Sequence, residues 1–130
     1  MAVVTVATDA TLKLRYTPME ARNNRAFFEE SPMKYYLCKF LPPRADFLAT
    51  MTADEVDLMK RHGAFLNDLL DKGVVVAHGP VDDPAGGWGL SLYQVADDVD
   101  VKALASQDPM VSAGGARYEV LPMRHLRSRG

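Results

Sequence analysis

The sequence predicts one α+β domain in which two helices cover one face of an antiparallel, four-stranded sheet. Its 130 residues are the size of a single domain that can bury its own core. Its composition, 48% hydrophobic and 25% charged, is typical of globular proteins. From residue 33 onward, β-rich and helically periodic segments follow in the order strand, helix, strand, strand, helix, strand.

Residues 1–32 are expected to be an N-terminal extension outside this domain, which then spans residues 33–130. Residues 2–6 are too short an apolar run to build a core, and residues 23–25 and 29–32 are rich in structure-breaking residues. Three interpretations stay open: an arm that docks on the domain or on a partner subunit, a mobile tail, or translated upstream sequence if Met33 is the natural start.

The first strand and the first helix have clear local signals. Residues 35–40 have the aromatic and apolar content of a buried strand, which a Pro-Pro pair ends. After a loop, Thr52 and Glu55 have the spacing of a capping box. We expect a helix with one apolar stripe, which Gly73 ends in a left-handed conformation. The stripe consists of Val56, Met59, Gly63, Leu66 and Leu70.

The middle of the chain predicts two strands joined by a loop. Residues 74–77 are a β-branched run, and the glycines and prolines of residues 79–87 predict a loop. Residues 88–95 then alternate, so that two sets of apolar side chains lie on opposite faces of one strand. One set is Trp88, Leu90 and Leu92, and the other is Ser91, Tyr93 and Val95. Both faces of the sheet are therefore expected to be covered.

The last two elements are a short helix and a strand. Asp97 or Asp98 is expected to cap the helix, which should end before Pro109. Residues 117–126 form the last predicted strand, in which Pro122 indicates an edge, a bulge or a strand end. The complete order is the split β-α-β pattern of ferredoxin-like domains. An apolar sheet face without helices would be an unusually large exposed patch, so a homodimer is expected to cover it.

Charge and composition argue against several classes of protein. The net charge of −2 lacks the broad positive field that supplies nucleic-acid affinity. No apolar run approaches the ~20 residues of a membrane span, and residues 1–7 lack the features of a signal peptide. A cytoplasmic protein is expected by default. Cys38 is the only cysteine, and it is expected to be a small buried residue without a disulfide.

Metal, phosphate and cofactor sites are not expected. The three histidines lack short ligand spacing. The glycine-rich segment 86–89 lies between two predicted strands, whereas a phosphate-binding loop opens a helix. The sequence also lacks the Gly-x-Ser-x-Gly motif of a hydrolase nucleophile.

His62 and Asp108 are the candidate catalytic residues. His62 precedes Gly63 of the apolar stripe, so its ring is expected at the border of the buried face, where an imidazole can move protons near neutral pH. Asp108 lies where the second helix gives way to Pro109, and is the natural partner that would orient the ring. The simpler alternatives are a packing or solvent-edge histidine and an ordinary turn aspartate.

The order and spacing of several short motifs resemble the YCII-related (YciI-like) family. The motifs are His62, Gly73, Gly79-Pro80, Asp108-Pro109 and Gly114-Gly115, within about residues 33–126. The resemblance implies a dimeric α+β barrel in which a His/Asp pair, matched here by His62 and Asp108, lines an active site. One family member is a lyase that eliminates hydrogen chloride from a chlorinated hydroxyquinol.

Four further residues are candidates for substrate binding. His78 stands where related sequences often carry a small or apolar residue, and is either a second pocket group or a strand-end histidine. Trp88 and Tyr36 either line an apolar pocket or pack in the core. Arg44 either meets an anionic substrate or remains solvated.

These observations support three hypotheses for function. The leading one is a small-molecule enzyme, a lyase or isomerase, that uses His62 as general base or acid on an oxygenated cyclic metabolite. The second is a non-catalytic metabolite-binding or accessory protein with the same dimer pocket. The third, by fold analogy alone, is a cofactor-independent monooxygenase or a haem-binding barrel.

Overall fold

The protein folds as the predicted α+β domain around an antiparallel sheet, in which the strands lie in the order β2-β3-β1-β4. The computed structural model describes residues 33–129, so the predicted N-terminal extension lies outside the described part. This strand order is consistent with a ferredoxin-like fold. The elements are β1 (Met33–Leu41), α2 (Phe47–Thr50), α3 (Ala53–Asp71), β2 (Val75–Val81), β3 (Trp88–Ala96), α4 (Val101–Ala105), α5 (Pro109–Ser112) and β4 (Arg117–Met123).

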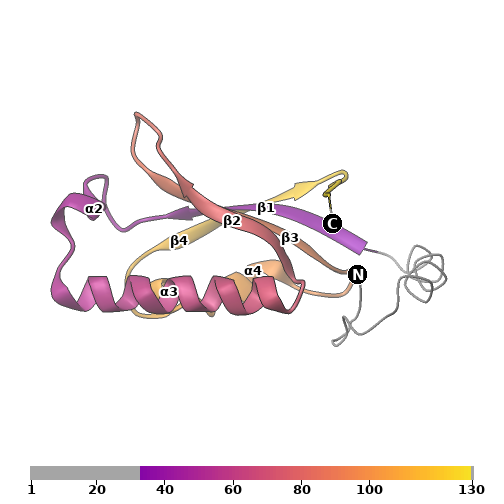
Figure 1. The fold of residues 1–130 in the computed structure, drawn as a ribbon, viewed down its shortest axis with the longest axis horizontal. Coiled ribbons are helices and arrows are strands. Elements are labelled where there is room, and N and C mark those ends of the chain that lie inside the picture. Colours follow the sequence, from indigo (N-terminus) through magenta and orange to yellow (C-terminus); the bar gives the residue numbers. More distant parts are fainter. Residues whose placement is uncertain (1–32, 130) are drawn as a thin grey trace.

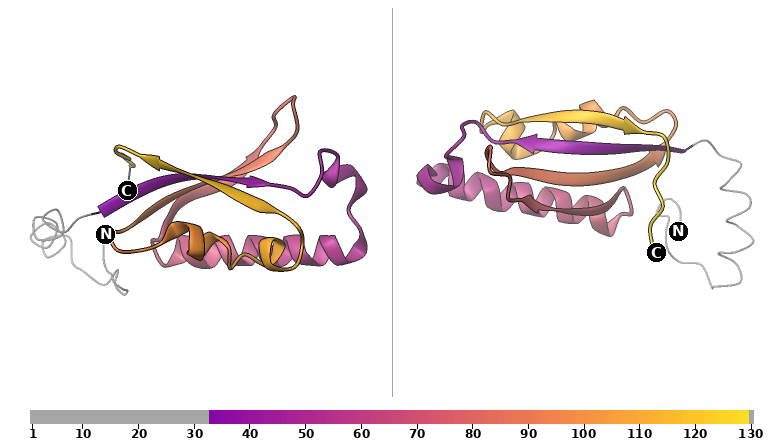
Figure 2. Two further views of the ribbon diagram at one scale, coloured as in Figure 1. Left: turned by 180° about the vertical axis from the view of Figure 1, so that it is seen from behind. Right: turned by 90° about the horizontal axis from the view of Figure 1, so that it is seen from above.

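Helices α3 and α4 lie on one side of the sheet, and the other side carries no helix (Figures 1 and 2). Helix α3 begins with the predicted capping box, in which Thr52 Oγ1 accepts from the Glu55 amide at 3.1 Å and Glu55 Oε1 accepts from the Thr52 amide at 2.9 Å. It ends beside Gly73, which has the predicted left-handed conformation with φ of 77°. No helix within residues 33–129 has the length and apolar character of a membrane span.

The buried face of α3 is rotated relative to the predicted stripe. Leu66 of the stripe is buried as predicted, but Val56 and Leu70, in the same stripe, are each 39% exposed. Leu69, which lies outside the stripe, is buried instead. His62 joins the buried face, since it precedes Leu66 by one turn and its side chain is only 12% exposed. The expectation that His62 lies at the border of this face was therefore wrong. An imidazole can be covered in this way when a partner satisfies its polar nitrogen.

Two predicted strand boundaries also change. Strand β2 runs on to Val81 through Pro80, where a loop was expected. This extension is possible because β2 is an edge strand, so Pro80 need not donate to a neighbour. Strand β4 is the other edge and contains Pro122, as predicted, but it ends at Met123.

The structure adds two short helices, α2 and α5, and the cap of α4 is at a different residue from the one predicted. Phe47 of α2 is 1% exposed, so a segment predicted as a loop contributes to the core. Asp100, not Asp97 or Asp98, caps α4, because its Oδ1 accepts from the Ala103 amide at 3.0 Å. This bond satisfies one of the free amides of the first helical turn.

The core lies between the sheet and the helices. Its first part contains Cys38, Leu69, Val75, Tyr93, Val95 and Val101. Its second part, called here the Phe40 cluster, contains Phe40, Phe47, Met110 and Ala116. The strand alternation predicted for residues 88–95 is confirmed, because Ser91, Tyr93 and Val95 are buried on the helix side. The helix-free face carries Tyr35, Leu37, Leu90, Leu92, Leu121 and Met123.

Candidate active site

His62 lies in the middle of α3, directly over an aromatic ring of the sheet. The ring centroids of His62 and Phe40 are 4.3 Å apart, with the planes tilted by 37°. On the neighbouring strand, Gly89 leaves room for this ring, since a Cβ there would come within 3.1 Å of Phe40 Cβ. The imidazole therefore packs against Phe40 of β1. Gly89 of β3 lies beside Phe40 and adds no side chain there.

Asp108 reaches His62 from the start of α5. Its Oδ1 accepts from the Met110 amide at 2.9 Å, and Pro109 occupies the first helical position. Its Oδ2 lies 2.6 Å from His62 Nδ1, which is the predicted contact. Asp108 is 0% exposed, whereas the sequence suggested a turn residue outside the apolar periodicity. The carboxylate can be buried because each of its oxygens has a donor.

Tyr118 of β4 is a third member of the site that sequence reasoning missed. Its hydroxyl donates to Asp108 Oδ2 at 2.6 Å, and its ring meets Phe40 edge-on with centroids 5.5 Å apart. Tyr118 is also the register partner of Phe40. Strand register would have pointed to it, but register is a tertiary property that a single sequence does not show.

Hydrogen bonds keep the Asp108 carboxylate ionised. Burial raises the pKa of Asp108, but the bonds from His62, Tyr118 and the Met110 amide outweigh burial, and its pKa lies below the usual value. Burial, and then the bond to Asp108, raises the pKa of the Tyr118 hydroxyl, which therefore remains a donor. An ionised carboxylate only accepts, so His62 Nδ1 carries the proton in this bond.

The other ring nitrogen of His62 is then the one available for chemistry. Nε2 has no hydrogen-bond partner among residues 33–129. With the proton on Nδ1, Nε2 has a free lone pair and can act as a base. The arrangement fixes both the orientation and the tautomer of the imidazole.

The model of the YCII-related domain matches residues 34–124. The chain belongs to the YCII-related domain family. The match includes all four strands, except Met33 at the start of β1, and both members of the His62–Asp108 pair. No curated protein and no solved structure matches the chain.

The predicted substrate-binding residues of this YCII-related domain do not converge on His62. His78 Nε2 lies 2.8 Å from Asn67 Oδ1, a contact that joins β2 to α3. Tyr36 packs against the first part of the core. Trp88 lies on the helix-free side, where Lys39 Nζ is 4.5 Å from its ring centroid.

Arg44 of the YCII-related domain joins the connection after β1 to the start of α3. Its guanidinium donates to both carboxylate oxygens of Glu55, at 2.9 and 2.8 Å. It also donates to Oγ1 and the carbonyl oxygen of Thr50, at 2.8 and 2.6 Å. The bonds from Arg44, and then the bond from the Thr52 amide, hold the pKa of Glu55 down, at about 2. Arg44 thus fixes α2 next to the capping box of α3.

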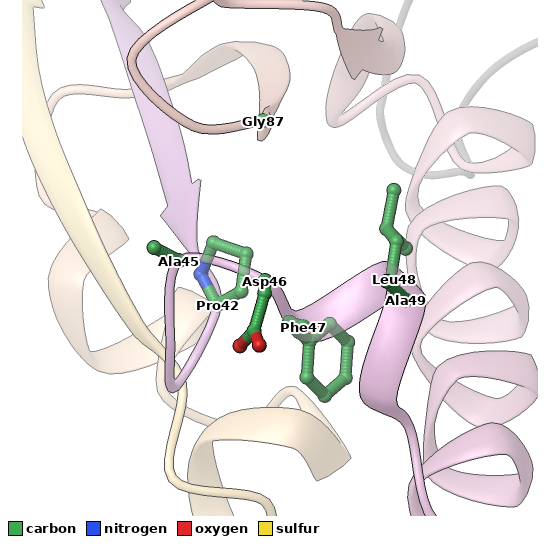
Figure 3. Close-up of a pocket in the computed structure, with 7 residues that line it drawn as sticks. All are labelled: Pro42, Ala45, Asp46, Phe47, Leu48, Ala49 and Gly87. Carbon is green, nitrogen blue, oxygen red and sulfur yellow. The ribbon is translucent and has the colours of Figure 1, made fainter.

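A shallow hollow of about 220 Å³ lies between α2 and the β2–β3 loop. Figure 3 shows Gly87 facing α2 and the preceding loop across this space. Its lining residues are Pro42, Ala45, Asp46, Phe47, Leu48, Ala49 and Gly87. Neither His62 nor Asp108 lines it, although Phe47 belongs to the Phe40 cluster.

Two other features bear on the chemistry of the YCII-related domain. Cys38 is fully buried, and burial raises its pKa to about 12, so its thiol is unreactive at neutral pH. In the described part of the chain, no three His, Cys, Asp or Glu side chains are close enough together to hold a metal ion.

Proposed function

We propose that this YCII-related domain is a small-molecule enzyme in which His62 transfers a proton and Asp108 orients it. The observation that carries the proposal is the buried contact of 2.6 Å between His62 Nδ1 and Asp108 Oδ2. A buried ion-pairing carboxylate is expensive to maintain for stability alone. The same contact fixes the tautomer and the ring orientation that a histidine needs to act as a general base.

The proposed reaction is an elimination or an isomerisation on an oxygenated cyclic metabolite. His62 Nε2 removes a proton from a carbon that an adjacent oxygen substituent acidifies. In an elimination, the C–H electron pair forms a double bond, the leaving group departs with the electron pair of its own bond to carbon, and the imidazolium then releases the proton to water. In an isomerisation, the imidazolium returns the proton to another atom of the substrate. Asp108 stabilises the imidazolium between the two steps.

His78 is the proposed substrate contact that the geometry supports best. It lies on the helix side of the sheet, like His62, and is only partly buried. On α3, a Cβ on Gly63 would meet no atom within 4 Å outside its own stretch of the helix, which supports space for a bound molecule at this position. The proposed roles of the other three have less support, because Tyr36 packs against the core, Trp88 lies on the helix-free side and Arg44 bonds to Glu55. His78 lies on the same side of the sheet as His62, although its Nε2 contacts Asn67.

The experiment compares His62→Gln with the control His125→Gln, because His125 is an exposed histidine. Metabolites that co-purify with the protein are identified by native mass spectrometry. Chlorinated hydroxyquinols and cyclic hydroxyketones are then tested for chloride release and for uptake of solvent deuterium. Loss of a general base typically costs about 10²–10⁴-fold in turnover. Equal activity in the two variants would refute the proposal.

The pair is expected to act as one unit. The double variant His62→Ala with Asp108→Asn should be little slower than the poorer single variant, because each change disables the same proton transfer. Additive losses would show that the two residues have independent roles.

We also propose a homodimer through the helix-free face of the sheet. The six residues named above for this face are apolar, and one of them, Leu121, is 47% exposed. A second copy would cover them, with an obligate interface of more than ~2,000 Å². Leu92→Lys should give monomers by light scattering, whereas Leu48→Lys on α2, where the side chain is 67% exposed, should not. A monomeric unmodified protein at micromolar concentration would refute this proposal.

The second candidate is a non-catalytic metabolite-binding or accessory protein. The hollow in Figure 3 favours it, because its lining includes neither His62 nor Asp108. A ligand that binds there would be affected by Ala49→Trp and not by His62→Gln. The reverse result would support the enzyme.

A further inference from the structure

We propose that Tyr118 is a positioning residue whose hydroxyl fixes the Asp108 carboxylate in the orientation that His62 needs. The expected effect of Tyr118 on turnover rests on the proposed function, but its expected effect on the Asp108 carboxylate does not. The structural part stands on the contacts of Asp108 alone.

The Asp108 carboxylate is held on both of its oxygens. Oδ1 accepts from the Met110 amide at 2.9 Å, while Oδ2 accepts from both His62 Nδ1 and the Tyr118 hydroxyl at 2.6 Å. The main-chain bond alone would allow the carboxylate to turn about its Oδ1 contact. The Tyr118 hydroxyl adds a second fixed point, so that Oδ2 stays in reach of the imidazole.

Tyr118 is itself anchored at its ring. Its ring contacts Phe40 edge-on, and Phe40 in turn contacts the imidazole of His62. A displacement of Tyr118 would therefore reach His62 by two routes, through Asp108 and through Phe40. Side chains whose own positions are fixed by packing make effective positioning residues.

A neighbouring tyrosine provides an internal comparison. Tyr93 of β3 is 0% exposed, and its hydroxyl has no hydrogen-bond partner in the described part of the chain. Both residues place a hydroxyl in the same core, but only that of Tyr118 contacts the carboxylate. A phenylalanine at position 93 removes a buried hydroxyl without touching Asp108, and so controls for the loss of a hydroxyl as such.

The groups that face Asp108 all bear on its titration. They are His62 from α3, Tyr118 from β4 and the Met110 amide. Burial and, in smaller part, the Asp108 charge raise the pKa of Tyr93 of β3, whose hydroxyl is uncharged where Asp108 titrates. Cys38 of β1 faces the two tyrosines and is neutral near pH 7. The bond from Tyr118 stabilises the ionised form of Asp108. Without this bond the pKa of Asp108 should rise, so the carboxylate should take up a proton at a higher pH.

The test compares Tyr118→Phe with Tyr93→Phe in the full chain. The titration of the Asp108 carboxyl carbon is followed by NMR, which needs no substrate. Tyr118→Phe should move the midpoint to higher pH, and Tyr93→Phe should leave it in place. Loss of a hydrogen bond to a charged group should reduce turnover about tenfold or more. The acid limb of the pH profile should move in the same direction as the carboxyl titration.

An unchanged Asp108 titration in Tyr118→Phe would overturn the inference. If that variant does not fold, the hydroxyl proton of Tyr118 in the unmodified protein is the test. A slowly exchanging, strongly downfield resonance supports the bond, and a rapidly exchanging one refutes it. Failure of the proposed function appears separately, as equal turnover in His62→Gln and His125→Gln.

Discussion

Replacing Asp108 with asparagine should lower the free energy of unfolding by about 1–3 kcal/mol, the cost of leaving a buried donor unsatisfied. Three donors converge on the carboxylate, from His62, Tyr118 and the Met110 amide. Asparagine offers one acceptor oxygen and turns an NH₂ group toward the remaining donors. A typical domain is stable by about 5–15 kcal/mol, so the variant should still fold.

The matched control is Asp100→Asn. Asp100 also caps a helix, with one bond to the Ala103 amide at 3.0 Å, but it is exposed. Asparagine caps helices about as well as aspartate, so this control should stay within ~0.5 kcal/mol of the unmodified protein. Urea denaturation near pH 7 measures both variants. Equal midpoints for the two variants would refute the claim that buried donors depend on Asp108.

The pH dependence of this difference has a definite sign. The pKa of Asp108 is lower in the folded protein than its usual value, so its ionised form stabilises the fold above the unfolded pKa of about 3.9. That contribution is lost as the pH falls through the lowered folded pKa. The gap in stability between the unmodified protein and Asp108→Asn should therefore narrow below about pH 4.

Three further predictions concern the rest of the chain. Gly89→Ala should cost about 1–3 kcal/mol, because its new methyl group overpacks the facing aromatic ring; Gly79→Ala, where a Cβ meets open space, is the control in urea denaturation. Arg44→Lys should cost less than about 1 kcal/mol, since the pair with Glu55 is partly exposed, and a thermal melt at low and high salt checks this. Deletion of residues 1–32 should leave the thermal transition nearly intact, and an unfolded or aggregated product would contradict that.

Much of the fold could be predicted because its signals are local. The capping box of Thr52 and Glu55 depends on residues three apart, and the left-handed stop at Gly73 depends on one residue. The strand alternation after Trp88 needs only a short segment. The contact of His62 with Asp108 was predicted with the help of the family resemblance, because the residues are 46 positions apart.

The remaining features depend on tertiary contacts. Tyr118 reaches Asp108 only because β4 pairs with β1 in one register. Asp108 and His62 can both be covered because each satisfies a polar atom of the other, and this contact between distant residues is not a local signal. Helix α2 has only four residues, too few for a clear periodic pattern. Arg44 fixes its position by bonding both to Thr50 of α2 and to Glu55 of α3, and the second of these bonds joins residues 11 positions apart.

The contacts of Asp108 also determine which atom of the site can exchange a proton with a substrate. Asp108 is fully buried, and its Oδ2 already has two donors at 2.6 Å, so a substrate could reach the carboxylate only by displacing His62 or Tyr118. The raised pKa of Tyr118 keeps its proton on the hydroxyl at neutral pH. His62 Nδ1 is occupied by Asp108, so in the proposed reaction Nε2 is the atom that would meet a substrate. A pair built in this way has one proton-transfer atom, so it suits reactions in which a single base removes a proton and then returns or releases it.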